Sequence, residues 1–214
     1  MGSRTGFVDG RTEAAPPGRS VVREYAEVIL VCVLAVIFLR AFVFQQSEIP
    51  SGSMEDTLLV GDYIIVNRFL YAPTSFEWER LLLPSREIRH GDVVVFKKPQ
   101  EPELDFIKRV IGLPGETIQV INRKVHINGK PLNDEEYAYH ASSRFVRGLD
   151  NHGPMKIPEN SYFMMGDNRE NSSDSRVWGP VPFELMKGKA FMIYWSWNGP
   201  ERNVRWSRIG DLLH

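Results

Sequence analysis

The sequence predicts a mainly β protein: an antiparallel β-sheet domain with an inserted hairpin or lobe, preceded by one N-terminal transmembrane helix. From residue 46 onward, short apolar stretches alternate with turn residues, and no helical period is sustained except over 206–213. The longest apolar run, Val28–Phe44, lies near the N-terminus. Hydrophobic residues make up 43% and charged residues 25% of the 214 positions, which is typical of a globular chain and excludes wholesale disorder.

The N-terminal part predicts a tail and an anchor. Residues 1–25 are rich in Gly, Pro, Arg and Ser, which predicts a flexible tail. Residues 26–45 are predicted to span the membrane, because Val28–Phe44 supplies 17 positions with Arg40 as the single charge. A cleaved signal sequence is disfavoured, since no small-x-small site follows the run. A buried core helix is the remaining alternative.

The charge pattern predicts the orientation of this anchor. Four arginines precede the apolar run, whereas the segment 41–67 contains no Lys or Arg. By the positive-inside rule the tail is cytoplasmic and residues 46–214 form an exported domain. The single cysteine, Cys32, lies inside the predicted span, so the exported domain has no thiol exposed to an oxidising compartment.

The exported domain shows strand and turn signals in sequence. Strand-like stretches occur at 57–69, 91–99, 105–121, 124–132 and 187–197. Pro114-Gly115 predicts a type II turn, and Asn128-Gly129 predicts a two-residue hairpin. Residues 70–89 form an irregular insertion, and a polar surface insertion is expected at about 122–160.

Composition excludes several classes of function. The net charge is −1, so no global basic field exists to bind nucleic acid. A single cysteine excludes an internal disulfide and a cysteine-based zinc site, and the five histidines are scattered, so no metal site is expected. No Gly-rich phosphate loop is present, and no cofactor is expected.

Two segments contain candidates for nucleophilic chemistry. Ser53 lies in Ile49-Pro50-Ser51-Gly52-Ser53-Met54, nine residues beyond Phe44, which places it near the outer membrane surface. A serine becomes a nucleophile only beside a base. Lys108 is the candidate base, because strand alternation over 106–111 puts it on one face with Phe106 and Val110. Burial there would lower its pKa, although most strand lysines are solvated.

A third segment, residues 164–176, is dense in side chains that form local hydrogen bonds. An elaborate turn explains such a composition. A hydroxyl from this segment would be able to orient a neutral lysine, and Asp174 has Arg176 or Arg109 as candidate partners.

These blocks together resemble the bacterial type I signal peptidases, or leader peptidases. IPSGSM, TLLVGD, GDVVVFKKP, FIKRVIGLPGE and MMGDNRENSSDSRVWGPV follow an N-terminal anchor in that order, and the resemblance extends from the span to the C-terminus. It implies a hydrolase of the bacterial cytoplasmic (inner) membrane, a Ser-Lys endopeptidase that removes signal peptides from exported preproteins after an Ala-x-Ala-like motif. It implies a mostly antiparallel β fold and, as partners, preproteins and the phospholipid membrane.

The resemblance also implies the roles of individual residues. Ser53 is expected to be the nucleophile and Lys108 its general base. The backbone N–H of Ser53 and the hydroxyl of Ser51 are expected to form the oxyanion hole. The residues expected to orient the lysine and support the wall of the site are Ser172, Asp174, Arg176 and Arg109. The residues expected to contact substrate are Ile49, Pro50, Phe106 and Ile107.

The substrate is expected to lie extended along the strand edges near 47–51 and 105–108. One departure from the family pattern concerns the nucleophile loop, where Asp56 stands at a position that is often proline. Two alternatives stay open. Self-cleaving repressors of the DNA-damage response share the dyad but have a DNA-binding N-terminal domain. A catalytically inactive, membrane-tethered homologue would act as a binding module.

Overall fold

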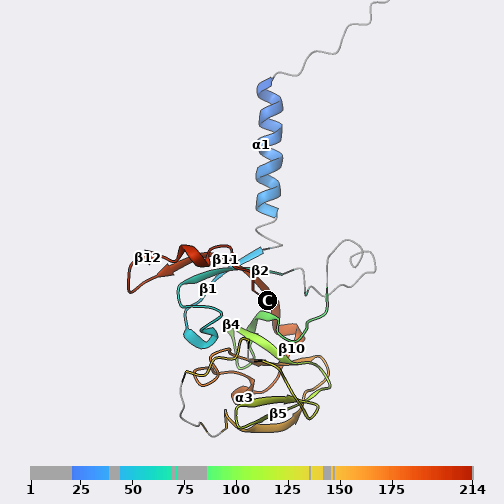
Figure 1. Cartoon of the computed structure of the whole chain (residues 1–214). Helices are drawn as coiled ribbons and strands as arrows, with labels where there is room; N and C mark the ends of the chain where they lie inside the picture. The colour runs from blue at the N-terminus through green and yellow to red at the C-terminus, as the bar shows by residue number, and fades with distance from the viewer. Residues whose placement is uncertain are drawn as a thin grey trace, which may run out of the picture. The chain divides into compact units, whose positions relative to one another are not determined.

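The computed structural model describes residues 21–38, 44–68, 71, 86–134, 136–141, 146 and 148–213 (Figure 1). The chain divides into two compact units: the helix α1 (Val21–Phe38) belongs to the first, and the described residues from Phe44 onward belong to the second. The predicted tail up to residue 20 and most of the predicted irregular insertion 70–89 lie outside the described residues.

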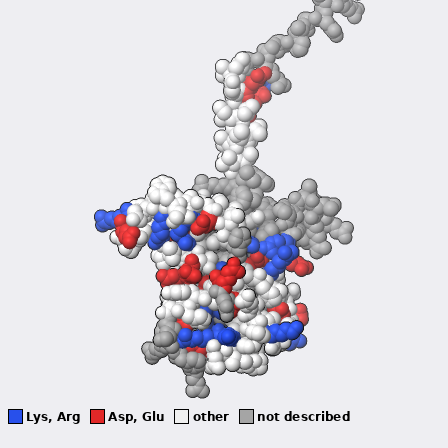
Figure 2. Space-filling view, in the orientation of Figure 1, with Lys and Arg blue, Asp and Glu red and all other residues white. Residues whose placement is uncertain are grey.

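The helix α1 begins at Val21, before the predicted start at residue 26. Its apolar side chains are largely exposed, with 60% of Val28 and 56% of Leu34 accessible, and its surface is mostly uncharged (Figure 2). None of the described helices combines the length and apolar character needed to cross a bilayer. The predicted anchor over 26–45 is therefore not shown, and its residues 39–43 lie outside the described part of the chain.

The second unit is mainly antiparallel β, as predicted. Its larger sheet has the strand order β1-β2-β11-β3-β4-β9-β10, with β12 paired to β11. The strands are β1 (Phe44–Glu48), β2 (Asp62–Asn67), β3 (Val93–Lys98), β4 (Glu101–Gly112), β9 (Ser161–Met165), β10 (Val181–Pro182), β11 (Met186–Asn198) and β12 (Asn203–Val204). Residues 44 and 45, which the prediction placed in the anchor, are the first residues of β1 and pair with Asn67 and Val66.

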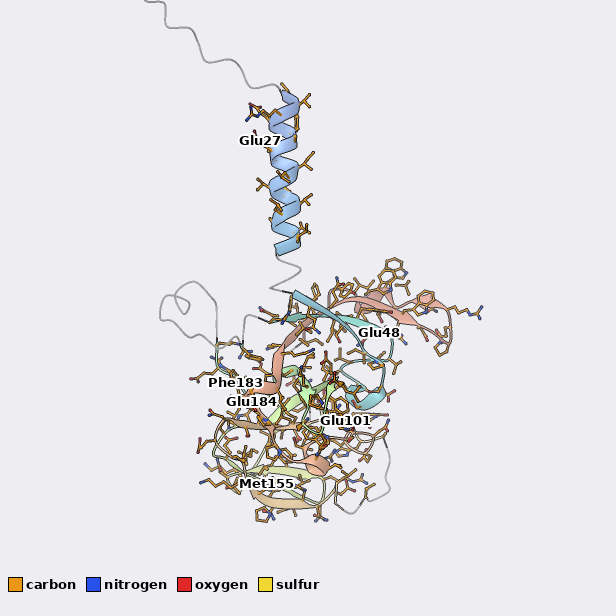
Figure 3. The ribbon with its side chains drawn as sticks, turned by 180° about the vertical axis from the view of Figure 1, so that it is seen from behind. Glu27, Glu48, Glu101, Met155, Phe183 and Glu184 are labelled. Atoms are coloured by element: carbon orange, nitrogen blue, oxygen red, sulfur yellow. The ribbon has the colours of Figure 1, made fainter. Side chains whose placement is uncertain are left out.

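A smaller sheet, ordered β7-β6-β5-β8, is formed within and beside the predicted surface insertion at 122–160. Met155 of β8 marks it in Figure 3. Its turns follow the sequence signals: Gly115 has a φ of 79°, and Asn128 and Gly129 have φ of 52° and 78°, the left-handed pair that a two-residue hairpin needs. The strands are β5 (Thr117–Ile121), β6 (Lys124–Ile127), β7 (Lys130–Pro131) and β8 (His152–Lys156).

Short helical turns complete the unit. The segment 57–60, predicted as part of the strand-like stretch 57–69, is a loop that buries Leu58. The segment 206–213 contains one 3₁₀ turn instead of a longer helix. The turns are η2 (Gly52–Met54), α3 (Ser175–Trp178), η4 (Phe183–Leu185) and η5 (Trp206–Arg208).

The core covers both faces of β3, which explains its uninterrupted apolar sequence. Val93 and Val95 pack on one face, and Val94 and Phe96 pack on the other. The first of these clusters also contains Met54 and Leu58, both fully buried, on either side of the loop that follows Ser53. The nucleophile candidate is therefore held by a loop whose flanking side chains are fixed in the core.

Charges of both signs alternate over the second unit. The face shown in Figure 2 has basic and acidic side chains interspersed, without a continuous basic surface. This agrees with the net charge of −1 for the whole chain. Among the described residues, no group of His, Cys, Asp and Glu side chains is arranged to hold a metal ion.

Candidate active site

Ser53 and Lys108 lie side by side although 55 residues separate them in sequence. Lys108 Nζ is 2.7 Å from Ser53 Oγ and also donates to the carbonyl oxygen of Ile107 at 2.9 Å. Ser53 belongs to η2, and Lys108 belongs to the part of β4 where the strand becomes buried. The two side chains are 8% and 3% exposed, so water has little access to either.

Burial makes Lys108 a weaker base than an ordinary lysine. Desolvation of the ammonium lowers its pKa from the ordinary value of 10.5 to about 8, against the opposing charges of Asp174 and Asp167. Both carboxylates form ion pairs with arginines, at 2.8 Å each, which limits their effect on the lysine. The Phe106 ring lies 5.3 Å from Nζ, a cation–π contact that favours the ammonium and is outweighed by desolvation.

The pair opens into a surface cavity of about 290 Å³. Three of the four predicted substrate-binding residues, Pro50, Phe106 and Ile107, line it, together with Ser51, Gly52, Ser53, Asp105, Lys108, Asn171 and Ser173. Ile49 was predicted to line a substrate pocket, but it does not line this cavity. Ile49 is 2% exposed and packs in the core with Met54. Its backbone N–H donates to the carbonyl oxygen of Asp62, and this pairing turns the side chain toward the core.

A second cavity of about 520 Å³ lies elsewhere and includes Asp56, Arg109 and Arg208 in its lining. Its lining contains no serine, cysteine or lysine, so it lacks a nucleophile with an amine base. The chemistry is therefore assigned to the smaller cavity.

The wall behind the lysine contains the predicted ion pair of Asp174 and Arg176. Asp174 is fully buried, accepts three hydrogen bonds from Arg176, and accepts another from the N–H of Gly166. A Cβ at Gly166 would lie 2.3 Å from Ser172 Oγ and 2.4 Å from Ser53 O, so only glycine fits between these groups. The residues of 166–176 are thus packed directly on the nucleophile loop.

One predicted contact and one of two candidate pairings are not formed in the structure. Ser172 is 6% exposed and lies beside Gly166, but its Oγ has no hydrogen-bond partner within the described residues, so the predicted contact with Lys108 is not formed here. Arg109 pairs with Asp167 instead of Asp174, because alternation along β4 points it away from Lys108. Sequence reasoning missed Asp167 because its neighbours in the same polar segment offered equally good partners.

The backbone conformation of Asp56 explains why this chain has no proline at that position, where the family often has one. Its φ is 85°, a left-handed conformation that the ring of proline excludes. Aspartate tolerates this region better than most residues. The loop after Ser53 therefore follows a path here that a proline at this position would not permit.

A buried serine held against a desolvated lysine, at the base of a cavity beside an antiparallel sheet, has the geometry of a serine hydrolase that operates without histidine. The family model described as "Signal peptidase, peptidase S26" matches residues 22–195. The signal peptidase I of Pseudomonas aeruginosa is 34% identical, covering 88% of this chain and 78% of that protein. The signal peptidase I of Leptolyngbya laminosa is 38% identical, covering 92% and 87%.

The chain therefore belongs to the signal peptidase family, peptidase S26, and it is a serine peptidase, a hydrolase of peptide bonds. A crystal structure of a signal peptidase I from Enterococcus faecalis, 29% identical, matches with a TM-score of 0.41 and covers 49% of this chain and 97% of that chain.

Proposed function

We propose that this chain is a membrane-bound signal peptidase I that cleaves N-terminal signal peptides from exported preproteins after an Ala-x-Ala-like motif. The observation that supports it most is the 2.7 Å contact between Lys108 Nζ and Ser53 Oγ, two residues that are nearly inaccessible to water at the base of a surface cavity. Signal peptidases of several bacteria are similar over most of the chain, which supports the substrate class.

In this proposal the neutral amine of Lys108 accepts the hydroxyl proton as Ser53 Oγ attacks the scissile carbonyl carbon. The resulting oxyanion accepts hydrogen bonds from the backbone N–H of Ser53 and the hydroxyl of Ser51. The tetrahedral adduct collapses, the C–N bond breaks, and the Lys108 ammonium returns its proton to the departing amine. Water, deprotonated by the same amine, then hydrolyses the acyl-enzyme ester and restores Ser53.

The substrate would add to the sheet as an extended segment. Within the described chain, β9 pairs with β4 only from Arg109 onward, so residues 105–108 keep one edge without a strand partner. A peptide lying along that edge and along residues 47–51 would place its scissile carbonyl at Ser53. Asp174 and Arg176 support the wall behind it, and Ser172 is proposed to orient Lys108 when substrate excludes the remaining water.

The membrane part of the proposal concerns the residues before β1. The exposed apolar side chains of α1 and the apolar residues that follow it in sequence support an anchor that ends before Phe44. The arginines that precede it favour a cytoplasmic N-terminus, with the peptidase domain on the outer, periplasmic side.

The test is cleavage of a preprotein with an Ala-x-Ala site by the full-length chain in detergent, with the new N-terminus determined by mass spectrometry. We expect cleavage after the second alanine, no cleavage when that alanine is replaced by tyrosine, and no cleavage by Ser53→Ala. Ser207→Ala, at an exposed serine, is the matched control and should retain activity. A folded wild-type chain that leaves several preproteins intact would favour the inactive homologue instead.

A further inference from the structure

Asn168 makes two contacts with the backbone of the nucleophile loop. Its backbone N–H donates to the carbonyl oxygen of Ser53 at 3.2 Å, and its side-chain Nδ2 donates to the carbonyl oxygen of Gly52, also at 3.2 Å. Only 1% of Asn168 is exposed. One buried residue from the segment after β9 thus contacts the carbonyl groups of two successive residues, one of them the nucleophile.

The surroundings fix which end of the Asn168 amide points at the loop. Nδ2 faces a second acceptor, Glu55 Oε2, at 3.2 Å. An amide NH₂ has two hydrogens, one for each of these acceptors, whereas an oxygen in the same place would face two acceptors without a proton. The carbonyl oxygen of Gly52 also accepts from the N–H of Glu55 at 3.1 Å, so Asn168 supplies the second of its two hydrogen bonds.

The consequence follows from the geometry of a peptide group. The carbonyl of Gly52 and the N–H of Ser53 belong to one planar trans peptide and point in opposite directions. A hydrogen bond that fixes the carbonyl therefore fixes the direction of the N–H. That N–H is the backbone donor of the proposed oxyanion hole, whose effect depends on donors held in place before charge develops.

We propose that Asn168 is a positioning residue that orients the Gly52–Ser53 peptide so that its N–H is directed at the developing oxyanion. This inference rests on the proposed function. The close packing of Gly166 against Ser53 O, where a Cβ would lie at 2.4 Å, holds the segment 166–168 at the distance that this contact requires. Asn168 acts through the peptide and touches neither substrate nor the reacting atoms.

The test compares wild type with Asn168→Ala and with Asn168→Asp, which keeps the shape but replaces the donor by an acceptor. For Asn168→Ala we expect kcat to fall about 10- to 100-fold with KM changed by less than about threefold, since the defect lies in transition-state stabilisation. Asn168→Asp should lose at least as much. Inhibition by a peptide aldehyde, which forms a tetrahedral adduct on Ser53, should weaken by the same factor as kcat/KM.

Two further readouts separate positioning from a structural or electrostatic effect. In Asn168→Ala, which adds no charge, the acid limb of the pH–rate profile should keep its midpoint, because Lys108 is not the group disturbed. Asn128→Ala is the control for stability: it removes a hydrogen bond to the N–H of Thr117 in the smaller sheet, at a left-handed φ of 52° where alanine is strained. It should lower the melting temperature without lowering kcat.

The inference is overturned if both Asn168 variants keep kcat within twofold of wild type or if only KM changes. It is also overturned if the midpoint moves in Asn168→Ala, or if Asn128→Ala loses kcat to the same degree. Failure of the proposed function has a different signature. In that case the wild type itself does not cleave, or Ser53→Ala still does.

Discussion

Replacing Lys108 by methionine is expected to lower kcat/KM for a preprotein by about 10⁴-fold, because it removes the only proton acceptor beside the Ser53 hydroxyl in the described site. Methionine has a similar length and keeps the site filled. Lys108→Arg should be equally inactive, since a guanidinium stays protonated and cannot accept the proton. Single-turnover cleavage at high enzyme concentration gives the residual rate. Activity within tenfold of wild type for either variant would remove Lys108 from the proposed role.

Lys108→Met is also expected to stabilise the fold, so a loss of activity in this variant cannot be caused by unfolding. The pKa of Lys108 is lowered to about 8 in the folded chain by burial, from 10.5. A lysine with a lowered folded pKa opposes folding at every pH below that value, by about 3 kcal/mol, and the penalty disappears as pH rises to the unfolded pKa. Lys108→Met should therefore raise the melting temperature at pH 7 and change it little near pH 11.

Replacing Asp167 by alanine is expected to destabilise the second unit by about 3–5 kcal/mol. Its fully buried carboxylate accepts from Arg109 at 2.8 and 2.9 Å and from the hydroxyl of Thr57 at 2.6 Å. The substitution leaves the guanidinium, only 3% exposed, without its buried counter-charge. Urea unfolding measures the loss in free energy.

Two comparisons make this prediction specific. Glu101→Ala breaks an ion pair with Lys98 at a glutamate that is 54% exposed, and it should cost less than about 1 kcal/mol (Figure 3). Replacing both partners, Asp167→Leu with Arg109→Met, should recover most of the stability if an uncompensated charge is the cause. A loss below about 1 kcal/mol for Asp167→Ala would show that the ion pair between Arg109 and Asp167 does not stabilise the second unit.

Local signals in the sequence predicted much of the fold. Short apolar stretches predicted β3 and β11, and the turns at 114–115 and 128–129 formed where glycine and asparagine permit left-handed backbone. The order of the motifs, through its resemblance to the type I signal peptidases, indicated Ser53 as the nucleophile and Lys108 as its base. Their contact was beyond any local pattern, since it depends on how β4 lies against η2, 55 residues away in sequence.

The remaining parts depend on register and on packing between distant segments. The sequence offered Asp174 as a partner for Arg109, whereas the pairing of Arg109 with Met165 in the sheet brings the following Asp167 beside it. Ile49 is apolar, as a residue lining a substrate pocket would be. Its place in the core depends on a hydrogen bond from its backbone N–H to the carbonyl oxygen of Asp62. Asn168 showed no signal of its own, because its role comes from two backbone carbonyls that only the folded loop presents.

The pH dependence of kcat/KM tests the central claim most directly. A peptide substrate without ionising groups would be followed from pH 6 to 10. The proposed mechanism requires the neutral amine of Lys108, whose pKa is lowered to about 8, so kcat/KM should be half-maximal near pH 8 and fall tenfold per unit below it. A limb centred near pH 6.5, or one that rises only toward pH 10.5, would contradict a desolvated lysine as the base.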